Sequence, residues 1–368
     1  MTAQGEPRTV TELDLQDLAT GAWILGTGGG GDPYHGLLNI QRLYREGRSV
    51  ALLDPMDLAD DDLVAVVAQM GAPLVSQERI TDPRMITKAV TTMEAYLGRR
   101  FCAVMSVEIG GGNGIQPFLA AAMLDLPVID ADGMGRAFPS VFHTSFAVMG
   151  YRPDPLSLVD IRANSVVLAE AADWLWVERV SRAVSVVLGS RSFTCKAPRT
   201  GKEVKEGSIR HTVSQAIRIG RTVREARQRH ADPIAALLES ERGRLLFRGK
   251  VEDVARRVTA GFLRGTVRLQ GLDRNRGQSY RIDFQNEFLI GYLDGRVQVT
   301  VPELICVLDS ESGAAVGTEA LRYGQRVTVI VLPAQALFLT ERGLAHTGPR
   351  AFDYDLDFVS AFAGGHAP

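Results

Sequence analysis

The sequence predicts two parts, an α/β domain over residues 1–165 with a mostly parallel sheet and a β-rich α+β domain over residues 166–368. Short apolar runs alternate with helical stretches in the first part, which is typical of parallel sheets. The second part has strand-like runs separated by polar turns. Residues 1–160 carry 11 Lys and Arg against 20 Asp and Glu, a net charge of −9, whereas residues 161–368 carry 30 against 23, a net charge of +7. The opposite charges indicate two parts with different surfaces.

In the first part, apolar periodicity and turn residues place the elements in order. Apolar residues that recur about every 3.6 positions indicate a helix, whereas short, continuous apolar runs are typical of strands buried on both faces. Pro33 favours a helix start at Tyr34, because the first turn of a helix does not use the missing N–H. We expect helices over 11–23, 34–46, 84–98 and 115–125, and strands over 63–68, 101–107 and 127–130.

In the second part, alternating and β-branched runs predict most of the elements. Strands are expected over 183–188, 261–269, 279–284, 298–302 and 325–331, and helices over 167–181, 208–229 and 232–240. The arginines of the 208–229 helix are spread around its circumference, so we do not expect it to bind nucleic acid.

Composition limits the class of protein. The 368 residues are 45% hydrophobic and 23% charged, which is ordinary for a globular chain. Three widely spaced cysteines argue against a disulfide scaffold. The sequence has no apolar run of 18 residues, and residues 1–14 lack the basic start and apolar run of a signal peptide. We therefore expect a cytoplasmic protein that does not enter a membrane.

The strongest local signal is the glycine run Gly28, Gly29, Gly30 and Gly31, followed by Asp32. Four consecutive glycines are entropically costly, and packing hardly justifies them. Backbone that a ligand can approach closely, next to a helix start that attracts anions, offsets this cost. No Gly-Lys-Ser/Thr follows, so no nucleotide is expected. Asp32 is either a helix cap or a base or metal ligand.

Two further segments follow predicted strands. Glu108 and Asn113 come after the 101–107 strand, at the edge of a parallel sheet where ligands usually bind. They are expected to be partners that hold a planar ring. Asp130 and Asp132 leave the next strand, and paired carboxylates can divide acid and base roles. Arg136 either pairs with these aspartates or binds an anionic group of the substrate.

Three more residues are candidates. His143 lies close to the acidic segment in sequence, and is either a satisfied structural histidine or a metal ligand. Cys195 precedes Lys196, and a neighbouring cation would lower the pKa of the thiol and make it a nucleophile or a metal ligand. The Gln285-Asn286-Glu287 segment at the end of a strand could place Asn286 or Glu287 in a cleft between the two domains.

These segments resemble the family once called domain of unknown function 917, now associated with S-methyl thiohydantoin desulfurases. The resemblance lies in Leu25 to Pro33, in Glu108 to Gly111 and, most specifically, in Asp-Ala-Asp-Gly-Met-Gly-Arg-Ala-Phe-Pro at 130–139. In the second half it includes Gln285-Asn286-Glu287 and Pro349-Arg350-Ala351-Phe352. The sequence departs from the family pattern at Ser140, Glu303 and Asp353.

The resemblance implies hydrolysis of a five-membered ring, such as an S-methyl thiohydantoin, to hydantoin and methanethiol. Asp130, Asp132 and Glu108 would then be catalytic, and Gly28 to Gly31, Asn113, Arg136 and Asn286 would bind the substrate. Asp32, His143 and Cys195 are candidate ligands of a divalent metal such as zinc. The alternatives are a hydantoin or oxoproline ring hydrolase and a non-catalytic binding partner of a hydantoinase-like enzyme. A homodimer is expected only because symmetric dimers are common.

Overall fold

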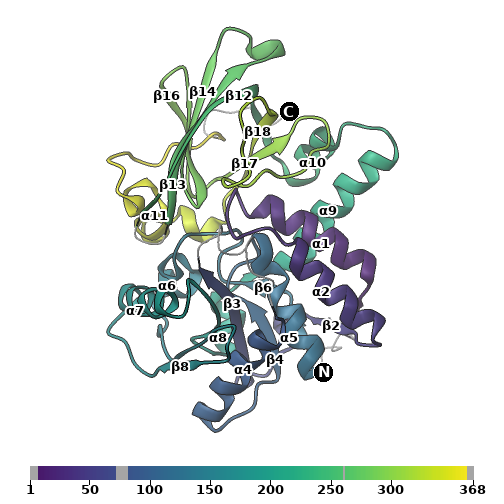
Figure 1. Ribbon diagram of the computed structural model, residues 1–368, viewed down its shortest axis with the longest axis vertical. Coiled ribbons are helices and arrows are strands. Elements are labelled where there is room, and N and C mark those ends of the chain that lie inside the picture. The colour runs from purple at the N-terminus through teal and green to yellow at the C-terminus, as the bar shows by residue number, and fades with distance from the viewer. Residues whose placement is uncertain (1–6, 72–81, 260–261, 363–368) are drawn as a thin grey trace.

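The computed structural model describes residues 7–71, 82–259 and 262–362 of the chain. Two sheets lie at opposite ends of the molecule, and helices α1 (Glu12–Leu25), α2 (Tyr34–Arg45) and α9 (Thr212–Gln228) lie along one side (Figure 1). The first half is α/β and the second half is rich in strands, as the sequence predicts. Gly261, the first residue of one predicted strand, is outside the described residues.

The N-terminal sheet is mixed, so its prediction as mostly parallel is not confirmed. Strands β2, β5, β4 and β3 run parallel to one another, in that order. Antiparallel strands flank them, with β1 at one edge and β9, β7 and β8 at the other, and β10 pairs with part of β3. The strands are β1 (Arg8–Val10), β2 (Val50–Leu53), β3 (Leu63–Gly71), β4 (Ala103–Ser106), β5 (Val128–Ile129), β7 (Leu156–Val159), β8 (Ser165–Leu168), β9 (Arg191–Lys196) and β10 (Arg199–Thr200).

Because β9 enters this sheet, chain beyond residue 165 helps to build the N-terminal layer. A small two-stranded sheet joins β6 (Ala131–Asp132) to β11 (Ile209–Arg210). The remaining helices are α4 (Arg84–Leu97), α5 (Gln116–Leu124), α6 (Ser145–Met149), α7 (Trp174–Val187), α8 (Gly201–Gly207), α10 (Pro233–Glu241) and α11 (Glu341–Thr347).

The C-terminal sheet is antiparallel throughout, in the order β16-β15-β14-β13-β12-β18-β17. Its strands are β12 (Arg244–Thr259), β13 (Phe262–Gly271), β14 (Ser279–Gln285), β15 (Glu287–Leu293), β16 (Arg296–Thr300), β17 (Leu304–Asp309) and β18 (Arg326–Leu332). Buried side chains such as Phe247, Tyr280 and Phe288 form its apolar core. The turn between β14 and β15 points toward the N-terminal part and carries Asn286, whose φ of 57° is left-handed.

The predicted strand over 183–188 is wrong, because α7 continues through it to Val187. Asp173 begins that helix by accepting a hydrogen bond from the Trp176 N–H. The β-branched side chains of this segment favoured a buried strand. Val187 is instead 86% exposed at the end of the helix. The start of the predicted 167–181 helix is also wrong, since residues 165–168 form strand β8.

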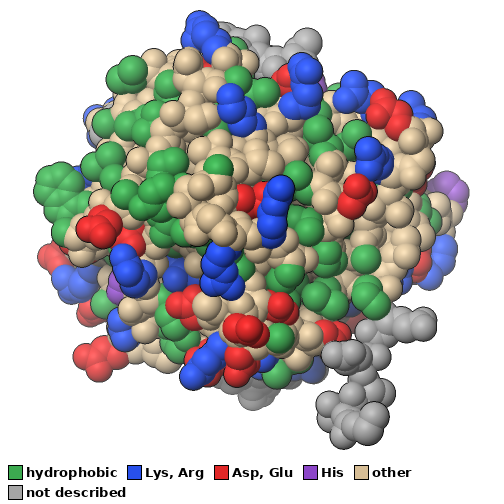
Figure 2. Space-filling view, turned by 90° about the horizontal axis from the view of Figure 1, so that it is seen from below, with side chains coloured by type: hydrophobic (Ala, Val, Ile, Leu, Met, Phe, Trp, Pro, Cys, Tyr) green, Lys and Arg blue, Asp and Glu red, His purple; other side chains and the backbone are tan. Residues whose placement is uncertain are grey.

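The surface carries charges of both signs. On the face shown in Figure 2, Lys and Arg side chains are interspersed with Asp and Glu. Within the described ranges, no helix combines the length and the apolar character that crossing a bilayer requires.

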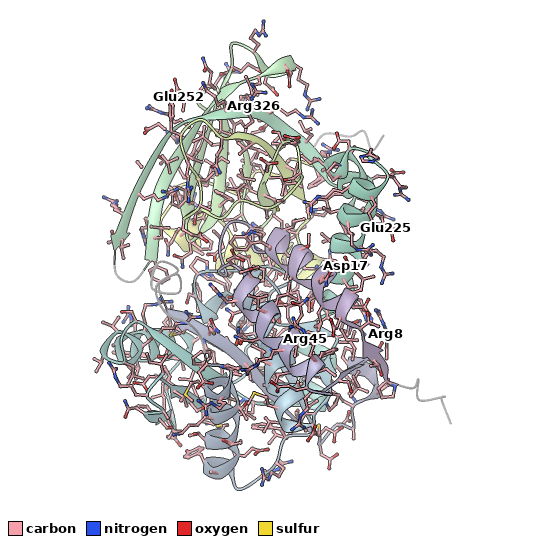
Figure 3. All side chains as sticks on the ribbon, turned by 45° about the vertical axis from the view of Figure 1, so that its right-hand side comes forward. Arg8, Asp17, Arg45, Glu225, Glu252 and Arg326 are labelled. Atoms are coloured by element: carbon pink, nitrogen blue, oxygen red, sulfur yellow. The ribbon has the colours of Figure 1, made fainter. Side chains whose placement is uncertain are left out.

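Helices α1 and α9 cross at very short range. A Cβ added to Gly220 of α9 would lie 1.9 Å from the carbonyl oxygen of Asp17 on α1. The carboxylate of Asp17 also accepts two hydrogen bonds from Arg224, at 2.8 and 2.9 Å. Figure 3 labels Asp17 where α1 runs beside α9. The crossing therefore combines a contact that requires glycine with an ion pair.

We expect Gly220→Ala to destabilise the protein. Helix propensity alone favours alanine by about 1 kcal/mol. Overpacking against the α1 backbone costs about 1–3 kcal/mol and should prevail, because backbone atoms cannot move aside as a side chain can. Urea unfolding monitored by circular dichroism measures the change in the free energy of unfolding. A variant more stable than the wild type would contradict the close crossing.

Candidate functional site

A cavity of about 240 Å³ lies between the two halves of the chain. The carboxyl ends of β3 and β4 and the segments after them form one part of its wall, through Gln69, Glu108 and Asn113. Asn286 and Glu287 come from the β14–β15 turn of the C-terminal sheet. The expected ligand-binding edge of the parallel strands therefore faces a cavity, and the 285–287 segment reaches it from the other domain.

Glu108 and Asn113 are hydrogen-bonded, as the sequence predicts. The Asn113 Nδ2 donates to Glu108 Oε1 at 2.6 Å, and the Phe138 N–H donates to Glu108 Oε2 at 3.1 Å. The Gln69 N–H donates to Asn113 Oδ1 at 2.7 Å, which fixes the amide against β3. Burial nevertheless raises the pKa of Glu108 to about 7, because the two donated hydrogen bonds offset only part of the desolvation. A group with this pKa can take up or release a proton near neutral pH.

Glu287 is a second buried carboxyl group in the cavity wall, and it is only 2% exposed. Burial raises its pKa well above the usual value, and the charge of Glu108 raises it further, while Arg136 opposes the shift. Its Oε2 atom is buried without a hydrogen-bond partner among the described residues. Glu287 therefore holds its proton more tightly than an ordinary glutamic acid does, and one of its carboxyl oxygens has no partner among the described residues.

The glycine loop lies against this carboxyl group. A Cβ on Gly29 would lie 1.9 Å from Glu287 Oε1, one on Gly28 would lie 2.4 Å from the Phe288 ring, and one on Gly30 would lie 2.5 Å from the Gly110 carbonyl oxygen. Packing therefore does require these three glycines, contrary to the sequence argument. Gly31 has open space around it, and Gly30 and Gly31 line the cavity. The loop connects α1 to α2 and does not follow a strand.

Basic side chains also line the cavity. Lys196 ends β9, and Arg182 and Glu178 come from α7. Arg182 donates to Glu178 Oε1 through its Nε at 2.7 Å, and the Val141 N–H donates to Glu178 Oε2 at 3.1 Å. Burial lowers the pKa of Lys196 to about 8, against the attraction of Glu178 and Glu108. The sequence analysis did not select Lys196 as a site residue.

Asp130 and Asp132 lie outside the cavity wall. Asp132 is fully buried and accepts hydrogen bonds from the N–H groups of Ile109, Met134 and Gly135 at 2.7–3.1 Å. Asp130 accepts from the Ser214 N–H at 2.9 Å, in the first turn of α9. Burial raises the pKa of Asp132 to about 7, but its oxygens face backbone donors. The two aspartates hold segments together beside the site.

Arg136 contacts protein carbonyls and not the two aspartates. It is 1% exposed, and its guanidinium donates to the carbonyl oxygens of Ala137, Pro302 and Glu303, each at 3.0 Å, and to Thr27 Oγ1 at 2.7 Å. These acceptors occupy the guanidinium, so the expected pairing with Asp130 and Asp132 is wrong. Arg136 links the 130–139 segment to the C-terminal sheet.

The three metal-ligand candidates do not come together. Asp32 lines the cavity and accepts from the Tyr34 N–H at 2.8 Å. His143 is buried among aromatic rings, its Nδ1 lies 2.6 Å from the His346 carbonyl oxygen, and burial lowers its pKa to about 4. Cys195 faces the apolar core, and burial raises its pKa, opposite to the expected effect of Lys196. In the described part of the chain, no three or more His, Cys, Asp or Glu residues converge as a metal site.

Comparison with known proteins identifies the family. Residues 13–170 match the S-Me-THD-like N-terminal domain, and residues 172–361 match the S-Me-THD-like C-terminal domain. The chain belongs to the S-Me-THD-like family. The family resemblance inferred from the glycine loop and the 130–139 motif is therefore confirmed. No curated protein matches the sequence.

A crystal structure of a protein from Chromobacterium violaceum is similar to this S-Me-THD-like chain. The TM-score is 0.81 at 23% sequence identity, and the match covers 96% of this chain and 100% of that one. At this identity the likeness concerns the fold, which both chains share over almost their whole length.

In this S-Me-THD-like protein, residues of the 130–139 motif line the cavity or stabilise the backbone behind its wall. Met134, Phe138 and Pro139 line the wall, whereas Asp132 and Arg136 bind backbone groups behind it. Sequence reasoning named Glu287 with Asn286 as a residue that could enter the cleft, and both line it. It missed Lys196, which follows the selected Cys195. Strand alternation could have found Lys196, because Cys195 and Lys196 must face opposite sides of β9.

We expect Asn113→Leu to raise the pKa of Glu108 by about one to two units, because a hydrogen bond to an ionised carboxylate is worth about 1.5–3 kcal/mol. Carboxyl carbon NMR of glutamate-labelled protein measures this pKa, with Glu108→Gln assigning the signal. Asn164→Leu is the control, because Asn164 makes the same kind of bond to the distant Asp160 at 2.9 Å. An unchanged Glu108 titration in Asn113→Leu would contradict the assignment.

Proposed function

We propose that this protein hydrolyses the C2–S bond of an S-methyl thiohydantoin, a five-membered 2-(methylthio)imidazolone ring, to give a hydantoin and methanethiol. The observation that carries the proposal is the pair Glu108 and Glu287, two buried carboxyl groups from different domains that line one cavity. Membership in the S-Me-THD-like family supports the choice of ring. The 240 Å³ cavity is of the size of a small heterocycle.

The two carboxyl groups have different proton affinities, which suits separate acid and base roles. Glu108, with a pKa of about 7, is partly ionised at neutral pH and can accept a proton from water. Glu287, with a pKa raised well above the usual value, holds a proton that it can donate. Two carboxyl groups near each other do not both ionise readily, because their charges repel.

The proposed reaction begins when Glu108 takes a proton from a water molecule. The water oxygen bonds to C2, and the electron pair of the C2–N double bond moves to the ring nitrogen, which then receives the proton from Glu108. The C2–S bond breaks as Glu287 protonates the sulfur. The added hydroxyl loses its proton through solvent to Glu287, and the C2 carbonyl of hydantoin forms. Both carboxyl groups end as they began.

Other residues of the cavity would hold the ring. Asn113 positions Glu108 through the 2.6 Å hydrogen bond, and Gly30 and Gly31, two of the four glycines expected to bind the substrate, line the cavity with their backbone. Asn286 lines the cavity beside Glu287. Asp32, His143 and Cys195 do not lie close to one another and take part in no step of the proposed reaction. The binding of a divalent metal stays a prediction. So do the homodimer and a hydantoinase-like partner.

We expect Glu108→Gln and Glu287→Gln each to lower kcat by about 10²–10⁴-fold, because each removes general acid–base catalysis. Methanethiol released from 2-(methylthio)imidazolones, captured with a thiol reagent, measures the rate. Glu94→Gln is a matched control, because Glu94 is equally a buried carboxyl group, 9% exposed, but lies away from the cavity.

The same assay separates the alternatives. Ring opening of hydantoin or oxoproline without release of methanethiol would replace this proposal with a ring hydrolase. Tight binding of the ring by wild-type protein without any turnover would favour a non-catalytic partner of a hydantoinase-like enzyme.

The pH dependence follows from the pKa of Glu108. The base acts only when it is ionised, so kcat/KM should rise about tenfold per pH unit below pH 7 and level off between about pH 7 and about pH 8. Initial rates between pH 5 and about 9 measure this limb. A rate that stays constant down to pH 5 would exclude Glu108, with a pKa of about 7, as the base.

A further inference from the structure

Lys196 is a buried cation in the cavity wall to which the acid–base steps assign no role. It is the last residue of β9 and is 6% exposed. Among the described residues, its ammonium group makes no hydrogen bond and no ion pair. A lysine that is mostly buried in a cavity wall and has no hydrogen-bond partner in the protein is available to a ligand in that cavity.

The neighbouring carboxylates are already held by other groups. Glu178 is bound by Arg182 and by the Val141 N–H, and Glu108 is bound by Asn113 and by the Phe138 N–H. Their charges attract Lys196, and Arg182 repels it. Both carboxylates keep the ammonium charged without forming a direct bond to it.

The charged groups of the cavity wall come from different regions of the chain. Lys196, Arg182 and Arg191 belong to α7 and β9, with Glu178 as their neighbour. Glu287 and Glu319 come from the C-terminal half of the chain, and Glu108 from the segment after β4. We place the ring with its C2 carbon at Glu108 and Glu287 and its C4 carbonyl toward Lys196, which lines the same cavity.

We propose that Lys196 is a catalytic residue that donates a hydrogen bond to the ring carbonyl oxygen of the substrate and stabilises the charge formed there when water adds. This inference rests on the proposed thiohydantoin hydrolysis. As the water oxygen bonds to C2, the electron pair of the C2–N double bond moves to the ring nitrogen and is shared with the conjugated C4 carbonyl oxygen. Lys196 keeps its proton throughout, and the nitrogen is later protonated by Glu108.

A preorganised donor aimed at charge that develops only in the transition state raises kcat more than it tightens substrate binding. Lys196 is suited to this role because it belongs to a strand of the sheet, which limits its movement, and is only 6% exposed in the cavity wall. Its pKa of about 8 leaves it charged over the range in which Glu108 becomes ionised. The two groups are thus both in their active forms between about pH 7 and about pH 8.

The experiment compares Lys196→Met and Lys196→Arg with the wild type on a 2-(methylthio)imidazolone. We expect Lys196→Met to lower kcat by about 10²-fold with little change in KM, as loss of one oxyanion donor does. Loss of its attraction should also raise the pKa of Glu108 and move the acid limb of the pH profile upward. Lys202→Met, which removes an exposed lysine of α8, is the control and should retain full activity.

Lys196→Arg keeps the charge to higher pH than lysine, so it should restore part of kcat and move the basic limb of the profile from about pH 8 upward. This variant and the wild-type profile test the inference even if Lys196→Met does not fold. An active wild type whose Lys196→Met variant keeps its kcat, or loses only KM, overturns the role of Lys196 alone. A wild type that releases no methanethiol overturns the proposed function together with this inference.

Discussion

The buried guanidinium of Arg136 connects the three parts of the chain that surround the cavity. It donates to Thr27 beside the glycine loop and to the carbonyl oxygens of Pro302 and Glu303 before β17. Because a guanidinium without acceptors could not be buried, these contacts depend on one another. The N-terminal sheet and the C-terminal sheet thereby hold a fixed relation, and Glu108 and Glu287 come to face the same space.

Desolvation is the dominant influence on the ionisable groups of the cavity. Burial raises the pKa of Glu108 and of Glu287 and lowers the pKa of Lys196, and local hydrogen bonds and charges determine how far each moves. The hydrogen bonds to Glu108 keep its pKa near 7, whereas Glu287 Oε2 has no described partner and its pKa lies higher. Burial in one cavity wall thus gives Glu108, Glu287 and Lys196 three different proton affinities.

The sequence predicts which segments lie near the cavity more reliably than it predicts the role of each residue in them. It placed the Glu108–Asn113 pair at the end of a strand, and their hydrogen bond is present. The family resemblance implied a catalytic role for Asp132, whose carboxylate accepts hydrogen bonds from backbone N–H groups in the structure. A carboxylate that will be hydrogen-bonded by the backbone has the same local sequence as one that will face a ligand.

Local periodicity, turns and a specific motif are enough to predict the family, the α/β order of the first half, strands β13, β14, β16 and β18 of the second half, and the Glu108–Asn113 partnership. They did not predict β9, β12, β15 or β17. Only the tertiary structure decided that Glu287 and Lys196 meet Glu108 at one cavity, that Arg136 binds carbonyls, and that Cys195 lies in the core. Burial and long-range contacts set these outcomes, and both depend on segments far apart in the chain.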